Sequence, residues 1–168
     1  MKLLILLIAI NTISAKGFKQ TAEKFLEEKF GNDAKIKFTL FQIPKEKKVE
    51  AENSVHQKFF RDKIYSWEIV KNDKIIARAF VDNVFGRFQP ITFLLVISKE
   101  GKILYFEILK YRSDHGGNVK EIWWRNQFIG KNVDSDFTVG KEIQAVSGAT
   151  ISVNSLTRGI KKLLLINK

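Results

Sequence analysis

The sequence contains no cysteine, and this absence excludes several kinds of site at once. Disulfide bonds, thiolate metal centres and anchoring through a lipid-modified cysteine are all impossible. The 168 residues also contain no internal repeat and no low-complexity linker, so a single domain is expected. Hydrophobic residues make up 45% of the chain and aromatic residues 12%, which is typical of a globular protein rather than a disordered one.

Clusters of catalytic residues are missing as well. The sequence shows no metal-binding cluster, no pair of carboxylates spaced for acid–base work, and no nucleophile–histidine–acid arrangement. One of the two histidines, His56, stands alone in a polar stretch and is interpreted as a surface residue. We therefore do not expect a stand-alone enzyme.

Long hydrophobic runs are absent apart from one at the N-terminus. Lys2 precedes the apolar stretch Leu3–Ile10, and small residues ending at Ala15 follow it. This order is typical of a secretory signal peptide, and the run is too short to span a membrane as a helix. We expect a signal peptide at residues 1–15 and one exported domain at residues 16–168, in the periplasm or elsewhere outside the cytoplasm. The alternative is a buried N-terminal helix.

Negative charge is scarce relative to positive charge, and the formal net charge is +11. A basic chain suits nucleic acid, an anionic membrane or an acidic partner. Export argues against nucleic acid. The charges are scattered among turns and strand faces, which favours a solvated surface with some attraction to anionic lipid.

The hydrophobic periodicity predicts an α+β fold, with an antiparallel sheet of hairpins, helices packed at both chain ends and one helix between. Two nearly continuous apolar strands are expected in the centre of the sheet, covered on both faces. The expected helices are residues 18–31, 47–60, 118–130 and 152–165, and the expected strands are residues 34–43, 64–70, 75–86, 90–97 and 103–111.

Four small residues, Ser147, Gly148, Ala149 and Thr150, come just before the last expected helix. Gly148 permits a sharp turn and a close backbone approach. One interpretation ends there, with Thr150 at or near the N-cap of the helix. The other is that a helix start with free N–H groups binds phosphate, and that the unshielded hydroxyl of Thr150 is esterified by a phosphoryl group.

The stretch "SGATIS" (residues 147–152) resembles the flavinylation motif of the FMN-binding domain family. That family includes the C subunit of the sodium-translocating NADH:quinone reductase and the G subunit of the Rnf electron-transfer complex. The resemblance covers residues 84–164 and implies that Thr150 carries FMN through a phosphoester bond, installed from FAD by a magnesium-dependent flavin transferase. Gln144 stands where the family has an aspartate that the transferase recognises.

The resemblance also implies further cofactor contacts. Backbone amides from Ala149 to Ser152 hold the phosphate, with help from the hydroxyls of Ser147 and Ser152. In the loop after the last strand, His115 and Gly116 approach the flavin ring, although His115 is equally suited to local packing. Gln127 either hydrogen-bonds the flavin edge or lies on the helix surface.

Two adjacent tryptophans, Trp123 and Trp124, precede Gln127. Neighbouring helical positions lie about 100° apart, so both rings cannot face the core. One of them is expected in the core, and the other faces solvent or the flavin ring.

The expected function is that of an exported flavoprotein that relays electrons between a membrane-bound redox partner and an extracytoplasmic acceptor. Two alternatives remain. One is a flavin-free scaffold or binding module of the same fold, which Gln144 favours. The other is an unrelated basic protein that binds surfaces and in which "SGAT" merely caps a helix.

Overall fold

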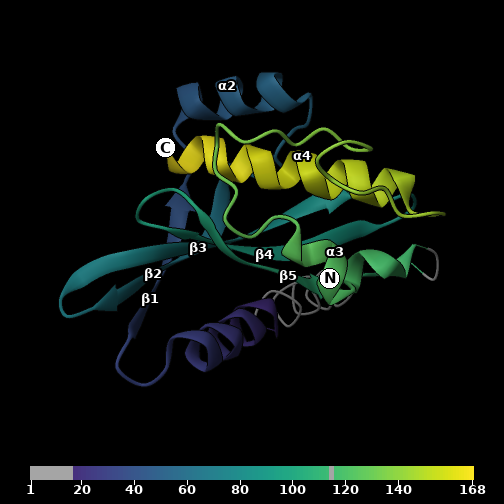
Figure 1. Ribbon diagram of the computed structural model, residues 1–168. Coiled ribbons are helices and arrows are strands. Elements are labelled where there is room, and N and C mark those ends of the chain that lie inside the picture. Colours follow the sequence, from purple (N-terminus) through teal and green to yellow (C-terminus); the bar gives the residue numbers. More distant parts are fainter. Residues whose placement is uncertain (1–16, 114–115) are drawn as a thin grey trace, which may run out of the picture.

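Five strands form one antiparallel sheet in the order β1-β2-β3-β4-β5 (Figure 1). In this order, each strand pairs with its neighbour in sequence, as expected for successive hairpins. The computed structural model describes residues 17–113 and 116–168. The strands are β1 (Lys35–Gln42), β2 (Lys63–Lys71), β3 (Lys74–Phe85), β4 (Pro90–Ser98) and β5 (Ile103–Lys110).

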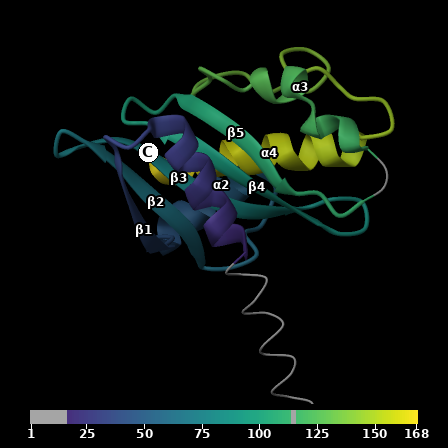
Figure 2. The ribbon, with the colours of Figure 1, turned by 90° about the horizontal axis from the view of Figure 1, so that it is seen from below.

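Helices cover both faces of this sheet. A helix over residues 17–30 lies on one face, and α4 (Thr150–Asn167) lies across the other, with α2 (Lys45–Val55) packed on its outer side (Figures 1 and 2). The predicted α+β architecture, with helices at both ends of the chain, is confirmed. A short α3 (Ile122–Asn126) lies beside β5 and is a further helix between the strands and the end of the chain.

Two hydrophobic cores result from this arrangement, one on each face of the sheet. Strand β4 supplies both, because Phe93, Leu95 and Ile97 point toward α4 whereas Leu94 and Val96 point toward the helix at residues 17–30. Alternate side chains of a strand point to opposite faces. A strand buried on both faces must therefore be apolar throughout, and the predicted central position is confirmed for β4. The same prediction is wrong for β5, which is an edge strand with most of its side chains only half-buried, because no further strand pairs with it in the described residues.

Helix α4 lies unusually close to the sheet at Gly159. A Cβ atom there would come within 2.5 Å of Val84 Cγ1 and 3.2 Å of Phe93 Cζ. Only glycine permits this distance, because any side chain would push α4 off the strands.

A buried ion pair also joins α4 to the sheet. Lys162 Nζ lies 3.2 Å from Asp82 Oδ2 on β3, and it donates a hydrogen bond of 3.0 Å to the Lys58 carbonyl. Burial raises the pKa of Asp82 and lowers that of Lys162, while the attraction between the two charges opposes both shifts. Each charge needs the other, because a lone charge in this core would be strongly destabilising.

Two predicted helices have different bounds in the structure. Helix α2 ends at Val55 rather than Phe60, because His56 adopts a left-handed conformation with φ of 52°. The stretch predicted as one helix over residues 118–130 divides into a 3₁₀ turn, Gly117–Lys120, and α3, because Glu121 between them is extended.

Within residues 17–113 and 116–168, no helix has the length and apolar character needed to cross a bilayer. The predicted signal peptide at residues 1–15 lies outside the described residues.

The close packing at Gly159 generates a stability prediction. Gly159→Ala should lower the free energy of unfolding by about 1 to 3 kcal/mol, because the added methyl group overpacks the contact with Val84. At an open helical site the same change would raise stability by about 1 kcal/mol. Urea unfolding followed by circular dichroism measures the difference. Ser155→Ala, at a half-buried position of the same helix, is the control and should change stability by less than about 0.5 kcal/mol. A stabilised Gly159→Ala variant would contradict the packing argument.

Candidate cofactor site at the start of the last helix

The four small residues form a tight turn that leads directly into α4. The Ala149 N–H donates to the Val146 carbonyl at 3.0 Å, and Gly148 has a positive φ of 73°. The side chains alternate in exposure, since Ser147 and Thr150 are exposed whereas Ala149 is buried in the core. Ala149 therefore anchors the turn, and the hydroxyl of Thr150 stays accessible.

Thr150 is the first residue of α4, and the N-cap position falls one residue earlier, on Ala149. No side chain of the described residues caps the helix, so the predicted capping hydrogen bond of Thr150 is not formed. The first turn also contains no acidic residue. Free N–H groups and the positive end of the helix dipole thus face an accessible hydroxyl, which suits a bound phosphate.

Ser152, in contrast, points inward. It is buried, and its hydroxyl shares a 2.9 Å hydrogen bond with the hydroxyl of Tyr111, just after β5. Its predicted hydrogen bond to the phosphate is not tested by this arrangement, but the side chain already has a structural partner. Sequence reasoning assigned Tyr111 to strand packing and missed this link between the strand end and the motif. The only sequence signal was its position between an apolar strand and a glycine-containing loop.

The loop after β5 returns to the same motif at Gly116. A Cβ atom on Gly116 would lie 3.0 Å from Ala149 Cβ and 3.0 Å from the Tyr111 hydroxyl. Gly116 also has a positive φ of 75°. The structure therefore brings together two predicted site residues, Gly116 and Ala149. The prediction for His115 lies outside the described residues.

Helix α3 holds the segment that precedes the motif. Gln127 Oε1 accepts the Gln144 N–H at 2.8 Å, and Trp124 Nε1 donates to the Gln144 carbonyl at 3.0 Å. Gln127 Nε2 donates to the Trp124 carbonyl at 3.2 Å, so both ends of the Gln127 amide have protein partners. The role of Gln127 as a flavin contact stays a prediction. The backbone of Gln144 is fixed in this way, whereas its side chain is exposed.

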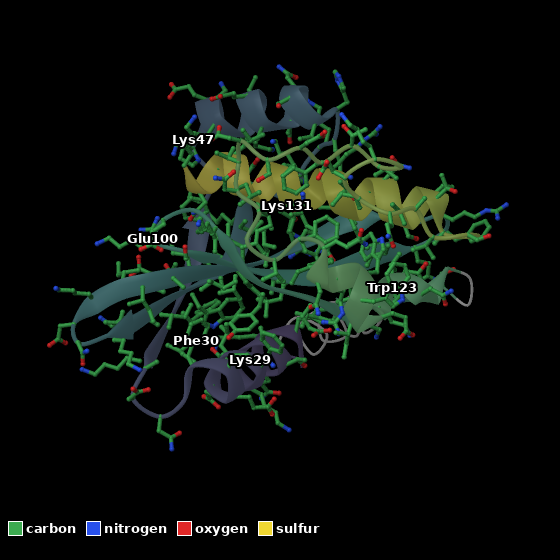
Figure 3. All side chains as sticks on the ribbon, in the orientation of Figure 1. Lys29, Phe30, Lys47, Glu100, Trp123 and Lys131 are labelled. Carbon is green, nitrogen blue, oxygen red and sulfur yellow. The ribbon has the colours of Figure 1, made fainter. Side chains whose placement is uncertain are left out.

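The two tryptophans separate as the helical geometry requires. Trp124 is fully buried against Phe128 and Phe106, whereas Trp123 is 50% exposed and points outward from α3 (Figure 3).

Arg112 connects this region to the β3–β4 hairpin. Its Nη1 atom donates to the Pro90 carbonyl at 2.6 Å and to Thr92 Oγ1 at 3.1 Å, and its guanidinium group lies over the ring of Phe18. Partial burial lowers the pKa of Arg112, although a guanidinium group remains charged at any physiological pH. Sequence reasoning missed this residue too.

Part of the chain is similar to a known class of cofactor-binding domain. Residues 86–165, which run from the β3–β4 turn into the last turn of α4, match the FMN-binding domain family. The chain thus contains a segment that is similar to that family, and this similarity supports FMN as its cofactor. The structure agrees with this match, because the matched residues include both the exposed hydroxyl of Thr150 and the uncapped start of α4.

A curated relative is the G subunit of the proton-translocating ferredoxin:NAD(+) oxidoreductase complex of Clostridium ljungdahlii. It is 30% identical over 99 residues, which cover 55% of this chain and 54% of the relative. The chain thus matches about half the length of this relative.

The contact between Gly116 and Ala149 generates a second prediction. Gly116→Ala should destabilise the protein by about 1 to 2 kcal/mol through its positive φ, and by about 1 to 3 kcal/mol more through the clash with Ala149. Gly101→Ala is the matched control, because Gly101 has a φ of 80° but nothing within 4 Å of an added Cβ. Equal losses of stability in the two variants, measured by urea unfolding, would show that the loop does not press on the motif.

Proposed function

We propose that this protein carries FMN covalently on Thr150 and relays electrons between a membrane-bound redox partner and an acceptor outside the cytoplasm. The observation that carries the proposal is the exposed hydroxyl of Thr150 on the first residue of an uncapped 18-residue helix, inside the matched FMN-binding domain.

The attachment requires the transfer of the FMN phosphoryl group from FAD to the hydroxyl of Thr150. The Thr150 oxygen forms a bond to the phosphorus atom on the flavin side of FAD, the pyrophosphate bond of FAD breaks, and AMP leaves. The hydroxyl proton is lost in the same step. A flavin transferase is the expected partner for this reaction, and the small residues Ser147 and Gly148 leave the hydroxyl open to it.

The helix start supplies the electrostatic support for the product. The phosphodiester retains one negative charge, which the N–H groups of Thr150, Ile151 and Ser152 and the helix dipole stabilise. The exposed hydroxyl of Ser147 is a further donor. Because the first turn contains no carboxylate, no like charge opposes the phosphate.

FMN accepts and donates electrons when it is bound, and the protein holds it in place. The covalent bond is useful outside the cytoplasm, where free FMN would be lost by diffusion. The support for export is the predicted signal peptide at residues 1–15. The support for a membrane-bound redox partner is the similarity to a subunit of an oxidoreductase complex.

A flavin-free scaffold or binding module of the same fold is the second candidate. Gln144 favours it, because the family has an aspartate at this position. A modifying enzyme would contact the exposed side chain of Gln144 and could distinguish this glutamine from an aspartate.

Removal of the hydroxyl tests the attachment. Co-expression with an exported flavin transferase should give a protein whose denatured mass exceeds that of the chain by one FMN less one water. Thr150→Ala should abolish this gain, because it removes the hydroxyl at the first residue of α4. Thr39→Ala, at an exposed threonine on the edge strand β1, is the control and should keep it. A denatured Thr150→Ala protein that retains flavin would refute the assignment.

The position of Gln144 can be tested in the same assay. Gln144→Asp should raise the modified fraction, because it restores the carboxylate that the family presents while the backbone contacts to Gln127 and Trp124 stay in place. Ala145→Asp adds the same charge at the neighbouring exposed position and should not raise it. If the wild-type protein is already fully modified, the transferase accepts a glutamine at position 144. If wild type stays unmodified while a known substrate is modified, the flavin-free candidate is favoured.

A further inference from the structure

Three exposed phenylalanines stand at one end of the sheet. Phe60 lies just before β2, Phe85 ends β3, and Phe88 lies in the β3–β4 turn. Their exposed fractions are 38%, 66% and 72%, and the rings of Phe60 and Phe85 are 4.5 Å apart between centroids. We call these three residues the aromatic tip. Grouped exposed rings of this size usually mark a surface that contacts something apolar.

Positive charge surrounds the aromatic tip. Near the three rings in sequence, the exposed cation Lys58 is paired with Glu52. Four other exposed cations lie near the rings or at the adjoining end of β5, namely Arg61, Lys63, Arg87 and Lys110. None of these four forms a salt bridge with another described residue. The guanidinium group of Arg87 lies 5.0 Å from the centre of the Phe88 ring.

The one acidic residue near these rings in the described sequence is already neutralised. Asp62 follows Arg61, and its carboxylate lies 2.6 Å from Lys48 Nζ. The remaining charge at the tip is therefore positive, which attracts a negatively charged surface.

We propose that the aromatic tip and its four cations dock on the surface of an anionic lipid bilayer. The phenyl rings would enter the boundary between headgroups and acyl chains, while the cations bind lipid phosphates. Exposed rings on a turn, next to unpaired cations, suit a lipid surface better than a protein interface. Protein interfaces are enriched in aromatic residues and arginine but depleted in lysine, and their cores hold few charges, so the two lysines and the high charge favour lipid. Each basic residue near an anionic bilayer contributes about 1 kcal/mol.

The docking surface lies at the same end of the molecule as Thr150. Two consecutive residues make the connection, since Tyr111 bonds to Ser152 on the first turn of α4 and Arg112 bonds to the Pro90 carbonyl at the base of the β3–β4 turn. Figure 2 shows the start of α4 and this turn on the same side of the molecule. Docking would thus bring the motif close to the bilayer. This last step rests on the proposed electron exchange with a membrane-bound partner, whereas lipid binding itself does not.

Flotation with lipid vesicles tests the proposal. The protein is purified as the cell produces it, and its binding is compared on vesicles of phosphatidylcholine alone and of phosphatidylcholine mixed with phosphatidylglycerol. We expect binding to the anionic vesicles that weakens as salt is added. Phe85→Ser/Phe88→Ser should weaken binding by about tenfold or more, and Arg87→Gln by about fivefold.

Matched controls lie at the opposite end of β3. Ile75 is an exposed apolar residue and Lys74 an exposed cation beside the β2–β3 turn, so Ile75→Ser and Lys74→Gln should leave vesicle binding unchanged. All variants carry the same N-terminus, and the substituted side chains are exposed. Thermal unfolding should therefore show that every variant remains folded.

Three results would overturn the proposal. They are no binding of wild type to anionic vesicles, equal binding by the double phenylalanine variant, and binding only to vesicles that contain membrane proteins. The last would identify the aromatic tip as a protein-docking surface. Intact mass measured on the same samples shows whether FMN is attached. A failure of lipid binding can then be distinguished from a failure of FMN attachment. A Thr150→Ala protein without flavin should bind lipid as wild type does.

Discussion

The packing of α4 against the sheet is the constraint on which the rest of the structure depends. The helix crosses the strands at Gly159, where a missing side chain permits close approach, and the buried pair between Lys162 and Asp82 joins it to β3. A helix held so tightly in its middle and toward its end has a fixed starting point. Thr150 is therefore placed by contacts that lie two turns or more away from it.

Three other segments meet at that starting point and complete the site. Strand β5 delivers Tyr111 to the first turn of α4, the loop after it presses Gly116 on Ala149, and α3 holds the backbone of Gln144. These contacts use backbone and buried groups, so they leave the hydroxyl of Thr150 uncovered. A site built in this way presents a rigid helix start, with its dipole and free N–H groups, to a phosphate, and it leaves Thr150 open to the flavin transferase that we propose.

The physical separation of the two proposed activities also follows from the fold. The proposed FMN attachment point belongs to the N-terminus of α4, whereas the aromatic tip belongs to the end of β3 and to the chain beside β2 and β4. They lie at one end because Tyr111, the residue after β5, bonds to Ser152 in the first turn of α4, and Arg112 bonds to the Pro90 carbonyl at the base of the β3–β4 turn. Covalent attachment and membrane docking can thus be changed by separate substitutions.

The sequence by itself determined the class of fold, the two-sided burial of β4, the exposure of one of the two adjacent tryptophans, and the resemblance to the FMN-binding domain family. Each depends on local periodicity or on a contiguous motif. Only the tertiary structure decided that Ser152 turns inward to Tyr111, since that contact spans 41 residues. It also decided that α4 starts without a capping side chain. Such pairings are set by how strands and helices pack, and no local pattern in the chain records them.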